Sequence, residues 1–331
     1  MRALELRKPQ PIEQAPLVEV ERPSPKPGTG QLRVRVLACG VCRTDLHLIE
    51  GDLAPPKLPL VPGHQIAGAV AEVGADAAGW QVGEPVGVPW LHRACGVCDA
   101  CRRGEENLCP DAEFTGMHRD GGYAESTIAE AEFALRLPAG WTPEAIAPLL
   151  CAGIIGYRSL RKTEIRPGER VGLIGFGASA HLALQIARHW GCPTAVFTRG
   201  AGHRLLAMDL GAAWAGGIED DAPWPLDRAV LFAPAGSLVP PILGKLRPGG
   251  TLAINAIHMS PIPEMPYPVL YGERTVRSVA HATRQDAVEL LELAEKIPLR
   301  SIVKTYPLSA ANQALADMKH GRLDAAAVLV P

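Results

Sequence analysis

Val171-Gly-Leu-Ile-Gly175-Phe-Gly177-Ala-Ser-Ala180-His181 is the stretch that decides the fold of the second half of the chain. A short apolar run ends in glycine and leads into a segment of helical periodicity, which predicts a strand, a tight turn and a helix. The spacing G-x-G-x-x-A is the dinucleotide-binding fingerprint with alanine at its third position. The first glycine permits the turn, the second lets the backbone approach a pyrophosphate, and the N–H groups of the helix start face the phosphates. The predicted nucleotide contacts here are Gly175, Gly177, Ala178 and Ser179.

Strands and helices alternate after this turn, which predicts crossover units and a doubly wound parallel sheet of the Rossmann type. Further strands are expected over 194–198, 229–233 and 251–256, and helices over 179–190, 203–210 and 238–246.

The end of the second strand indicates which nicotinamide cofactor is bound. NAD-binding folds place Asp or Glu there, but this strand ends in Thr198-Arg199-Gly200, with a cation and no acid. Thr198 and Arg199 could bind a 2′-phosphate, and Arg204 is a possible second cation. We therefore predict NADP as the preferred cofactor. The alternative is that Arg199 stacks on adenine and the chain binds NAD.

Residues 1 to about 150 have a different pattern, rich in short strands and turns. Residues 32–37 alternate apolar and basic side chains, and residues 65–73 form a second strand-like run. After about residue 284, a helix, a strand, a helix and a final strand are expected over 286–297, 301–306, 310–320 and 326–330. Periodicity alone leaves open whether this tail extends the parallel sheet or returns to the first half.

A loop without periodicity carries four thiols, Cys95, Cys98, Cys101 and Cys109. Their spacing allows them to wrap one tetrahedral ion. Four thiolates leave no open coordination position, so the loop predicts a structural zinc ion. An iron–sulfur cluster is the alternative, because it also uses four thiolates.

Three other segments carry metal-binding residues: Gly40-Val-Cys42-Arg43-Thr44-Asp45-Leu-His47, Pro62-Gly-His64, and Cys151. Each is weak evidence alone. Together with Asp120-Gly-Gly-Tyr-Ala-Glu125, the thiol loop and the glycine turn, in this order, the chain resembles the zinc-dependent medium-chain alcohol dehydrogenases over nearly its whole length.

The resemblance implies a catalytic zinc held by Cys42, His64 and Cys151, with a fourth position open for substrate. A zinc alkoxide formed there would pass a hydride to NAD(P), giving an aldehyde or ketone reversibly. Thr44 and His47 would carry the released proton away, because a hydroxyl donates and accepts and an imidazole titrates near neutrality. Asp45 would orient the His64 ring.

Further features follow from the same resemblance. Arg43 would contact the pyrophosphate, and Trp90 and Thr44 would line the substrate pocket. Gln65 departs from the family, which commonly has Glu there, so a transient role of that side chain as a zinc ligand is in doubt. The expected domains are a GroES-like β-barrel catalytic domain, 1–152 and 285–331, and a Rossmann domain, 153–284.

The amino-acid composition of the chain limits the kinds of binding partner that can be expected. A net charge of −2 and a chain that is 47% hydrophobic give no reason to expect nucleic acid, a membrane surface or disorder. The N-terminus has no secretion signal pattern, so a cytoplasmic location is expected. The expected partners are a small alcohol or carbonyl substrate and further copies of the chain, as a dimer or tetramer. Two alternatives stay open: a polyol or otherwise specialised dehydrogenase of the same family, and a non-catalytic zinc- and nucleotide-binding redox sensor.

Overall fold

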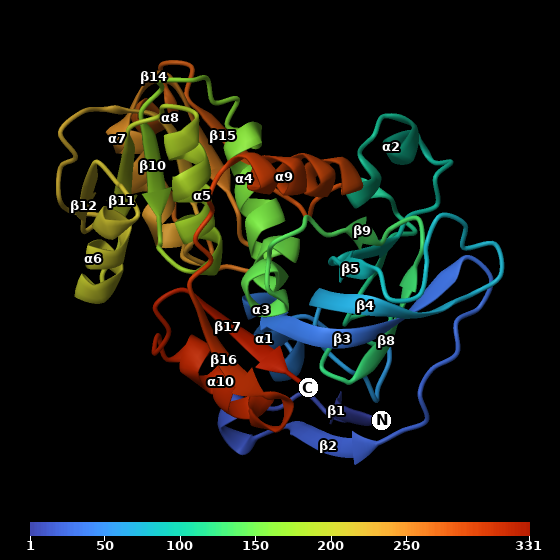
Figure 1. Ribbon diagram of the computed structural model, residues 1–331. Coiled ribbons are helices and arrows are strands. Elements are labelled where there is room, and N and C mark those ends of the chain that lie inside the picture. The colour runs from blue at the N-terminus through green and yellow to red at the C-terminus, as the bar shows by residue number, and fades with distance from the viewer. The chain divides into compact units, whose positions relative to one another are not determined.

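A computed structural model describes residues 1–331 and divides them into two compact units (Figure 1). One unit contains Met1–Ala152 and His281–Pro331, and the other contains Gly153–Ala280. None of the helices combines the length and the apolar character that crossing a lipid bilayer requires.

The first unit is built on a seven-stranded sheet. The central strand, β3 (Gln31–Val41), pairs antiparallel with β4 (Gln65–Val73) and β8 (Ser126–Glu130). Beyond β4 follow β5 (Pro85–Val88) and β9 (Leu135–Arg136), and on the other side of β3 lie β17 (Ala326–Val330) and β16 (Val303–Pro307). The antiparallel pairing of β17 with β3 answers the question that periodicity left open, because the tail joins this sheet and not the parallel one.

Alternation along β3 explains how this sheet acquires a core. Leu32, Val34 and Val36 are buried, whereas Arg33 and Arg35 point to the more exposed side. The remaining elements of the unit are β1 (Arg2–Leu6), β2 (Leu17–Glu21), β6 (Leu91–Arg93), β7 (Glu113–Phe114), α1 (Arg43–Glu50), α2 (Asp99–Arg102), α3 (Pro143–Ile146), α9 (Arg284–Lys296) and α10 (Ala311–Lys319).

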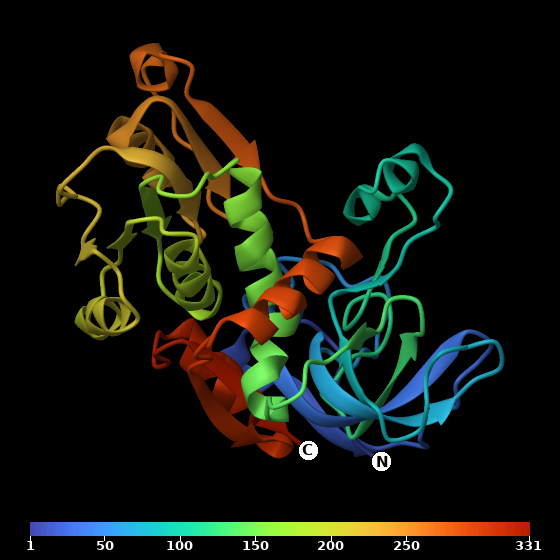
Figure 2. The ribbon, with the colours of Figure 1, turned by 45° about the horizontal axis from the view of Figure 1, so that its top comes forward.

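The second unit is a six-stranded parallel sheet, which confirms the expected Rossmann-type arrangement. The strand order is β12 (Trp214–Gly216), β11 (Thr194–Phe197), β10 (Val171–Ile174), β13 (Leu226–Leu231), β14 (Leu246–Ile254) and β15 (Thr275–Ser278). The order reverses direction at β10, so right-handed crossovers place α5 (Ala178–His189) and α7 (Val239–Lys245) on opposite faces. Helices α4 (Ala152–Lys162), α6 (Ala201–Asp209) and α8 (Tyr267–Leu270) complete the helices around this sheet (Figures 1 and 2).

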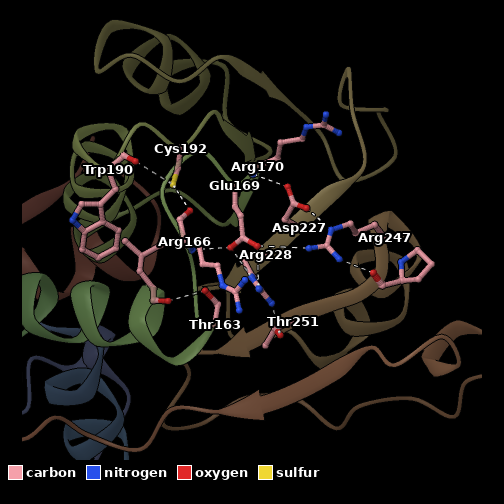
Figure 3. Close-up of polar contacts among 12 residues, drawn as sticks. Thr163, Arg166, Glu169, Arg170, Trp190, Cys192, Asp227, Arg228, Arg247 and Thr251 are labelled. Atoms are coloured by element: carbon pink, nitrogen blue, oxygen red, sulfur yellow. Dashed lines mark hydrogen bonds and ion pairs between the residues drawn. The ribbon is translucent and has the colours of Figure 1, made fainter.

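A buried ion pair connects β13 to the segment before β10, and a further hydrogen bond connects it to the middle of β14 (Figure 3). Arg228 on β13 donates two hydrogen bonds to Glu169, which precedes β10, at 2.9 and 3.1 Å. Its third nitrogen donates to the Thr251 hydroxyl on β14 at 3.1 Å. Arg247 adds a bond to Asp227. Arg228 is only 8% exposed, so its charge is compensated almost entirely by Glu169.

Candidate metal and nucleotide sites

Cys42, His64 and Cys151 meet in the first unit, as the sequence predicted for a metal site. Cys42 caps α1 directly after β3, His64 directly precedes β4, and Cys151 lies between the 3-10 turn Ala147–Leu150 and α4. Because Gly40 pairs with Gln65 across β3 and β4, the strand register brings the first two side chains together. The two sulfurs and one ring nitrogen lie within 4.8 Å of one another.

Asp45, which is fully buried, organises this cluster. One carboxylate oxygen accepts from His64 Nδ1 at 2.9 Å, and the other accepts from the Cys42 backbone N–H at 2.9 Å and from Tyr123 Oη at 3.1 Å. With Nδ1 directed at Asp45, the imidazole presents Nε2 to the two thiols, where a metal ion would take the place of a proton. Nε2 is buried and has no hydrogen-bond partner. A buried, unpartnered nitrogen beside two thiols fits a soft divalent cation such as zinc.

The pKa values of Cys42, His64 and Cys151 depend strongly on one another, because the three side chains are buried together. The hydrogen bond from Cys151, together with His64, holds the pKa of the Cys42 thiol well below its ordinary value. The Cys42 thiolate and burial in turn raise the pKa of Cys151 well above it. Burial disfavours the His64 imidazolium, but Asp45 and Cys42 outweigh that effect and raise the pKa of His64 to about 10. A divalent ion bound here would displace the protons that the Cys151 thiol and the His64 ring hold in its absence, so its affinity would increase with pH.

Gly63 is required for this packing. Its φ of +96° lies in the left-handed region, and a Cβ there would approach the Tyr123 ring to 2.4 Å and the Cys39 sulfur to 2.9 Å. Cys39 is itself buried, but its thiol donates to the Gly40 carbonyl and belongs to neither group of metal-binding side chains. Its burial raises the pKa of that thiol.

The two residues expected to move the proton lie on α1. Cys42 Sγ and Thr44 Oγ1 are 3.7 Å apart, so this hydroxyl lies beside a sulfur of the candidate metal site. His47 follows three residues later on the same helix and is 8% exposed. Its Nδ1 contacts Asp52 Oδ2 at 2.8 Å. We did not predict Asp52 from the sequence, and the only signal is the helix-ending Gly51 that turns the chain back toward His47.

Trp90 lies directly against the metal cluster. Its ring meets the His64 ring edge to face, with centroids 4.6 Å apart, and stacks on Phe114 at 5.0 Å. Its indole N–H donates to His281 Nδ1 at 3.0 Å. Phe114 and His281 could not be predicted from the sequence, because nothing local to either residue indicates that they converge on Trp90.

The four thiols of the loop also converge, with their sulfurs within 4.8 Å of one another. Cys95 and Cys101 Sγ are 4.0 Å apart, close to the separation of about 3.8 Å expected for two sulfurs on one tetrahedral zinc ion. Three backbone N–H groups, those of Cys95, Cys98 and Cys101, donate to sulfurs within the loop. Bonds from Val97 and Cys98 lower the pKa of Cys95 to about 7. The loop, with the short helix α2, projects from the strands of its unit (Figures 1 and 2).

The glycine turn of the second unit has the geometry of a phosphate loop. Gly175 has φ +88°, and a Cβ there would come within 2.9 Å of the Ala233 nitrogen. A Cβ at Gly177 would meet nothing within 4 Å, so the space beside it is open. Helix α5 starts at Ala178, followed by Ser179, which leaves their N–H groups at its amino end.

The end of β11 carries cations and no acid. Arg199 is exposed, and Arg204 donates its Nε–H to the Thr198 carbonyl at 2.9 Å, which braces the loop. The His203 ring lies over Gly200 and approaches Phe176 of the glycine turn, with ring centroids 6.5 Å apart. His203 was not predicted from the sequence and adds a third basic side chain. Arg43, which was expected to contact the pyrophosphate, belongs to the other unit.

His181, in the first turns of α5, predicts an acid-sensitive second unit. It is fully buried, and desolvation lowers its pKa to about 4. Since the unfolded chain binds this proton near pH 6.5, the stabilisation is complete above that pH and is lost as the pH falls toward 4. We expect the loss to reach about 2–3 kcal/mol at about pH 4.5. Urea unfolding of His181→Gln should show a weaker dependence on pH over this range than the wild type; equal slopes would contradict the prediction.

Comparisons with known proteins agree with this arrangement. Residues 28–139 match the alcohol dehydrogenase GroES-like domain. The probable alcohol dehydrogenase AdhA of Mycobacterium tuberculosis is 49% identical over all of this chain and 97% of its own length. An alcohol dehydrogenase of Geobacillus stearothermophilus is 35% identical, covering 94% of each chain. The structure of a cobalt- and zinc-bound alcohol dehydrogenase from Pyrobaculum aerophilum superposes with a TM-score of 0.91 at 25% identity, covering 100% of this chain and 99% of that one.

These relatives span nearly the whole chain, and they confirm both the GroES-like fold and the Rossmann fold expected from the sequence. The chain belongs to the zinc-dependent medium-chain alcohol dehydrogenase family and is an NAD(P)-dependent alcohol dehydrogenase.

Proposed function

We propose that Cys42, His64 and Cys151 hold a catalytic zinc ion at which alcohols are oxidised reversibly to aldehydes or ketones. The observation that carries the proposal is the buried, unpartnered His64 Nε2, turned toward two thiols by Asp45. Zinc held by three ligands would supply Lewis-acid activation of the substrate oxygen, and NAD(P) would exchange the hydride. Trp90 and the Thr44 hydroxyl flank this cluster and would form part of the substrate pocket.

We propose that the metal sites and the cofactor site lie in different domains. A catalytic domain, 1–152 and 285–331, would carry both metal groups, and a Rossmann domain, 153–284, would carry the cofactor. The two compact units of the fold support these boundaries to within four residues. Eight free thiols, six of them gathered in metal-type clusters, support a reducing compartment such as the cytoplasm.

Alcohol-dependent formation of reduced nicotinamide by the purified protein tests this function. A panel of primary, secondary and polyhydric alcohols should be run with both cofactors, because the site does not itself identify the substrate. Activity that disappears after removal of zinc and returns on adding it is the expected result. A protein that binds zinc and nucleotide but oxidises nothing in the panel would support the redox-sensor alternative.

Proton removal would use Thr44 and then His47. The Thr44 hydroxyl can accept the substrate proton while donating its own, and His47 is held by Asp52 through Nδ1. Replacing His47 with Gln should slow alcohol oxidation about tenfold near pH 6.5 and much less near pH 9, where the solvent accepts protons readily. The pH profile of kcat for the two proteins checks this. An unchanged profile would remove His47 from the relay.

We propose that NADP is preferred over NAD. Thr198 and Arg199 directly follow β11 and Arg204 lies in the first turn of α6, so the segment after the strand offers two cations and no acid of its own to a 2′-phosphate. One carboxylate, that of Asp220, lies beside Arg204 near Gly217. Replacing Arg199 with Asp should lower kcat/KM for NADP roughly 10- to 100-fold and leave that for NAD within a few fold, because one charge-assisted contact is lost. Steady-state kinetics with both cofactors measures this. A wild-type preference for NAD would indicate that Arg199 stacks on adenine.

We propose that the thiol loop, Cys95, Cys98, Cys101 and Cys109, binds a second, structural zinc ion. The sulfur separations and the N–H bonds to sulfur support this assignment. Metal analysis should give two zinc ions per chain; stoichiometric iron with visible absorbance would indicate a cluster instead.

We propose that copies of the chain associate through the edge of the parallel sheet. Strand β15 pairs only with β14 and is largely exposed, and Tyr267 and Tyr271 beside it are 70% and 67% exposed. An open edge flanked by exposed aromatic side chains favours strand pairing between copies. Sedimentation velocity should give a dimer or tetramer.

A further inference from the structure

We propose that His281 is a positioning residue that fixes the Trp90 ring against His64 and thereby sets the size discrimination of the substrate pocket. This inference rests on the proposed function of the Cys42, His64 and Cys151 site. The observation behind it is the hydrogen bond from the Trp90 indole to His281 Nδ1, 3.0 Å long, between residues far apart in the sequence.

The Trp90 ring is held on three sides. It meets His64 at a centroid distance of 4.6 Å and an angle of 70°, and it stacks on Phe114 at 5.0 Å and 15°. The His281 ring packs on the same Phe114, with centroids 4.5 Å apart. Trp90 is 8% exposed, so its N–H has little access to water and depends on the acceptor at His281.

The backbone of His281 is itself held in place. Its φ is +53°, a left-handed conformation that histidine adopts more readily than most residues. Two residues later, Thr283 caps α9 in a reciprocal capping box with Asp286. The next residue, Arg284, forms a two-pronged ion pair with Glu106 at 2.8–3.1 Å.

Glu106 lies within the thiol loop, three residues before Cys109. The backbone N–H of Arg284 also donates to this carboxylate, at 2.6 Å, so the start of α9 is anchored to the loop by both backbone and side chain. Because the start of α9 is anchored in this way, the segment that carries His281 is held in place. The His281 acceptor can therefore determine the orientation of the Trp90 indole.

Loss of the acceptor would leave the Trp90 N–H buried and unpaired, and the ring would rotate to find another partner. Rotation would change the space beside His64. A change of about one methylene in a pocket of this kind alters relative kcat/KM by roughly 10- to 200-fold. We therefore expect loss of the His281 acceptor to change the order of kcat/KM values among alcohols, mainly through KM. The zinc content of the protein should change little.

The test compares His281→Asn with His281→Leu. Asn Oδ1 takes the place of His Nδ1 and Asn tolerates a positive φ, whereas Leu has a similar shape without an acceptor. The ratio of kcat/KM for a bulky alcohol, benzyl alcohol, to that for ethanol is measured for each. We expect His281→Leu to shift this ratio at least about tenfold and His281→Asn to remain near wild type.

Trp90→Phe provides a second measurement, because it removes the donor without altering position 281. The double variant Trp90→Phe, His281→Leu should then shift the ratio no further than Trp90→Phe alone. Fully additive shifts, or equal effects of Asn and Leu, would overturn the proposal. If the wild-type protein keeps two zinc ions but oxidises no alcohol, the proposed function fails. If the wild-type protein is active and His281→Leu shows the same order of preference among alcohols, only the inference about His281 fails.

Discussion

Replacing Cys151 with Ser is expected to remove one of two zinc ions and to lower kcat for alcohol oxidation about a thousandfold. A serine hydroxyl stays protonated near neutral pH and cannot take the place of a thiolate ligand. The Lewis-acid contribution of a bound metal amounts to several kcal/mol of transition-state stabilisation, which corresponds to about three powers of ten in rate. Metal analysis and steady-state kinetics on one preparation measure both losses.

Cys39→Ser is the matched control for this variant. Cys39 is buried on β3 and near Gly63, but its sulfur is outside the metal-binding group, and a serine there can still donate to the Gly40 carbonyl. Cys39→Ser should retain both zinc ions and most of the activity. If Cys151→Ser kept its second zinc ion and its turnover, the proposed ligand set would be wrong.

Replacing Arg228 with Met should lower the free energy of unfolding of the second unit by about 3–5 kcal/mol. Arg228 and Glu169 are joined by two hydrogen bonds, and their side chains are only 10% and 16% exposed (Figure 3). Without this guanidinium, the largely buried Glu169 carboxylate would be left with the Arg166 backbone N–H, at 2.7 Å, and the more distant Arg247 guanidinium, at 3.6 Å. Urea unfolding, followed by a probe in this unit, measures the change.

Two further variants separate the buried charge from a general packing defect. Adding Glu169→Gln to Arg228→Met removes the uncompensated charge and should restore part of the lost stability. Arg247→Met changes a neighbouring arginine that is 41% exposed, pairs with Asp227 and approaches Glu169 only to 3.6 Å, and it should cost about 1 kcal/mol or less because solvent screens its charge. An equal loss for Arg228→Met and Arg247→Met would contradict our interpretation of the buried pair.

The features that the sequence predicted well are local ones. The glycine turn lies within about ten consecutive residues, so spacing alone indicated a strand, a turn and a helix, and the structure has them. The thiol loop is equally compact, and its sulfurs do converge. The strands and helices predicted for the second unit lie within a few residues of those observed, except that β14 begins five residues earlier than expected. Four elements were not predicted: β12, β15 and α8, which are only three or four residues long, and the longer helix α4.

The Cys42, His64 and Cys151 group could be proposed only through family resemblance. No spacing rule joins these positions, because they are brought together by the register of β3 with β4 and by the turn before α4. The same reason explains why His281 and Asp52 were missed. Their significance depends on Trp90 and His47 being beside them in space, and one of these pairs is nearly two hundred residues apart in the sequence.

The two groups of metal-binding side chains also differ in how much of the chain each one needs. The four thiols of the loop all lie within residues 95–109. Bringing them together closes only a short loop, which costs little conformational entropy and does not require a folded sheet. The other group draws on residues 42–151 and exists only after β3 and β4 have paired. With the ligand sets proposed above, the nascent chain would bind an ion at the thiol loop early in biosynthesis, and at Cys42, His64 and Cys151 only after the sheet has formed.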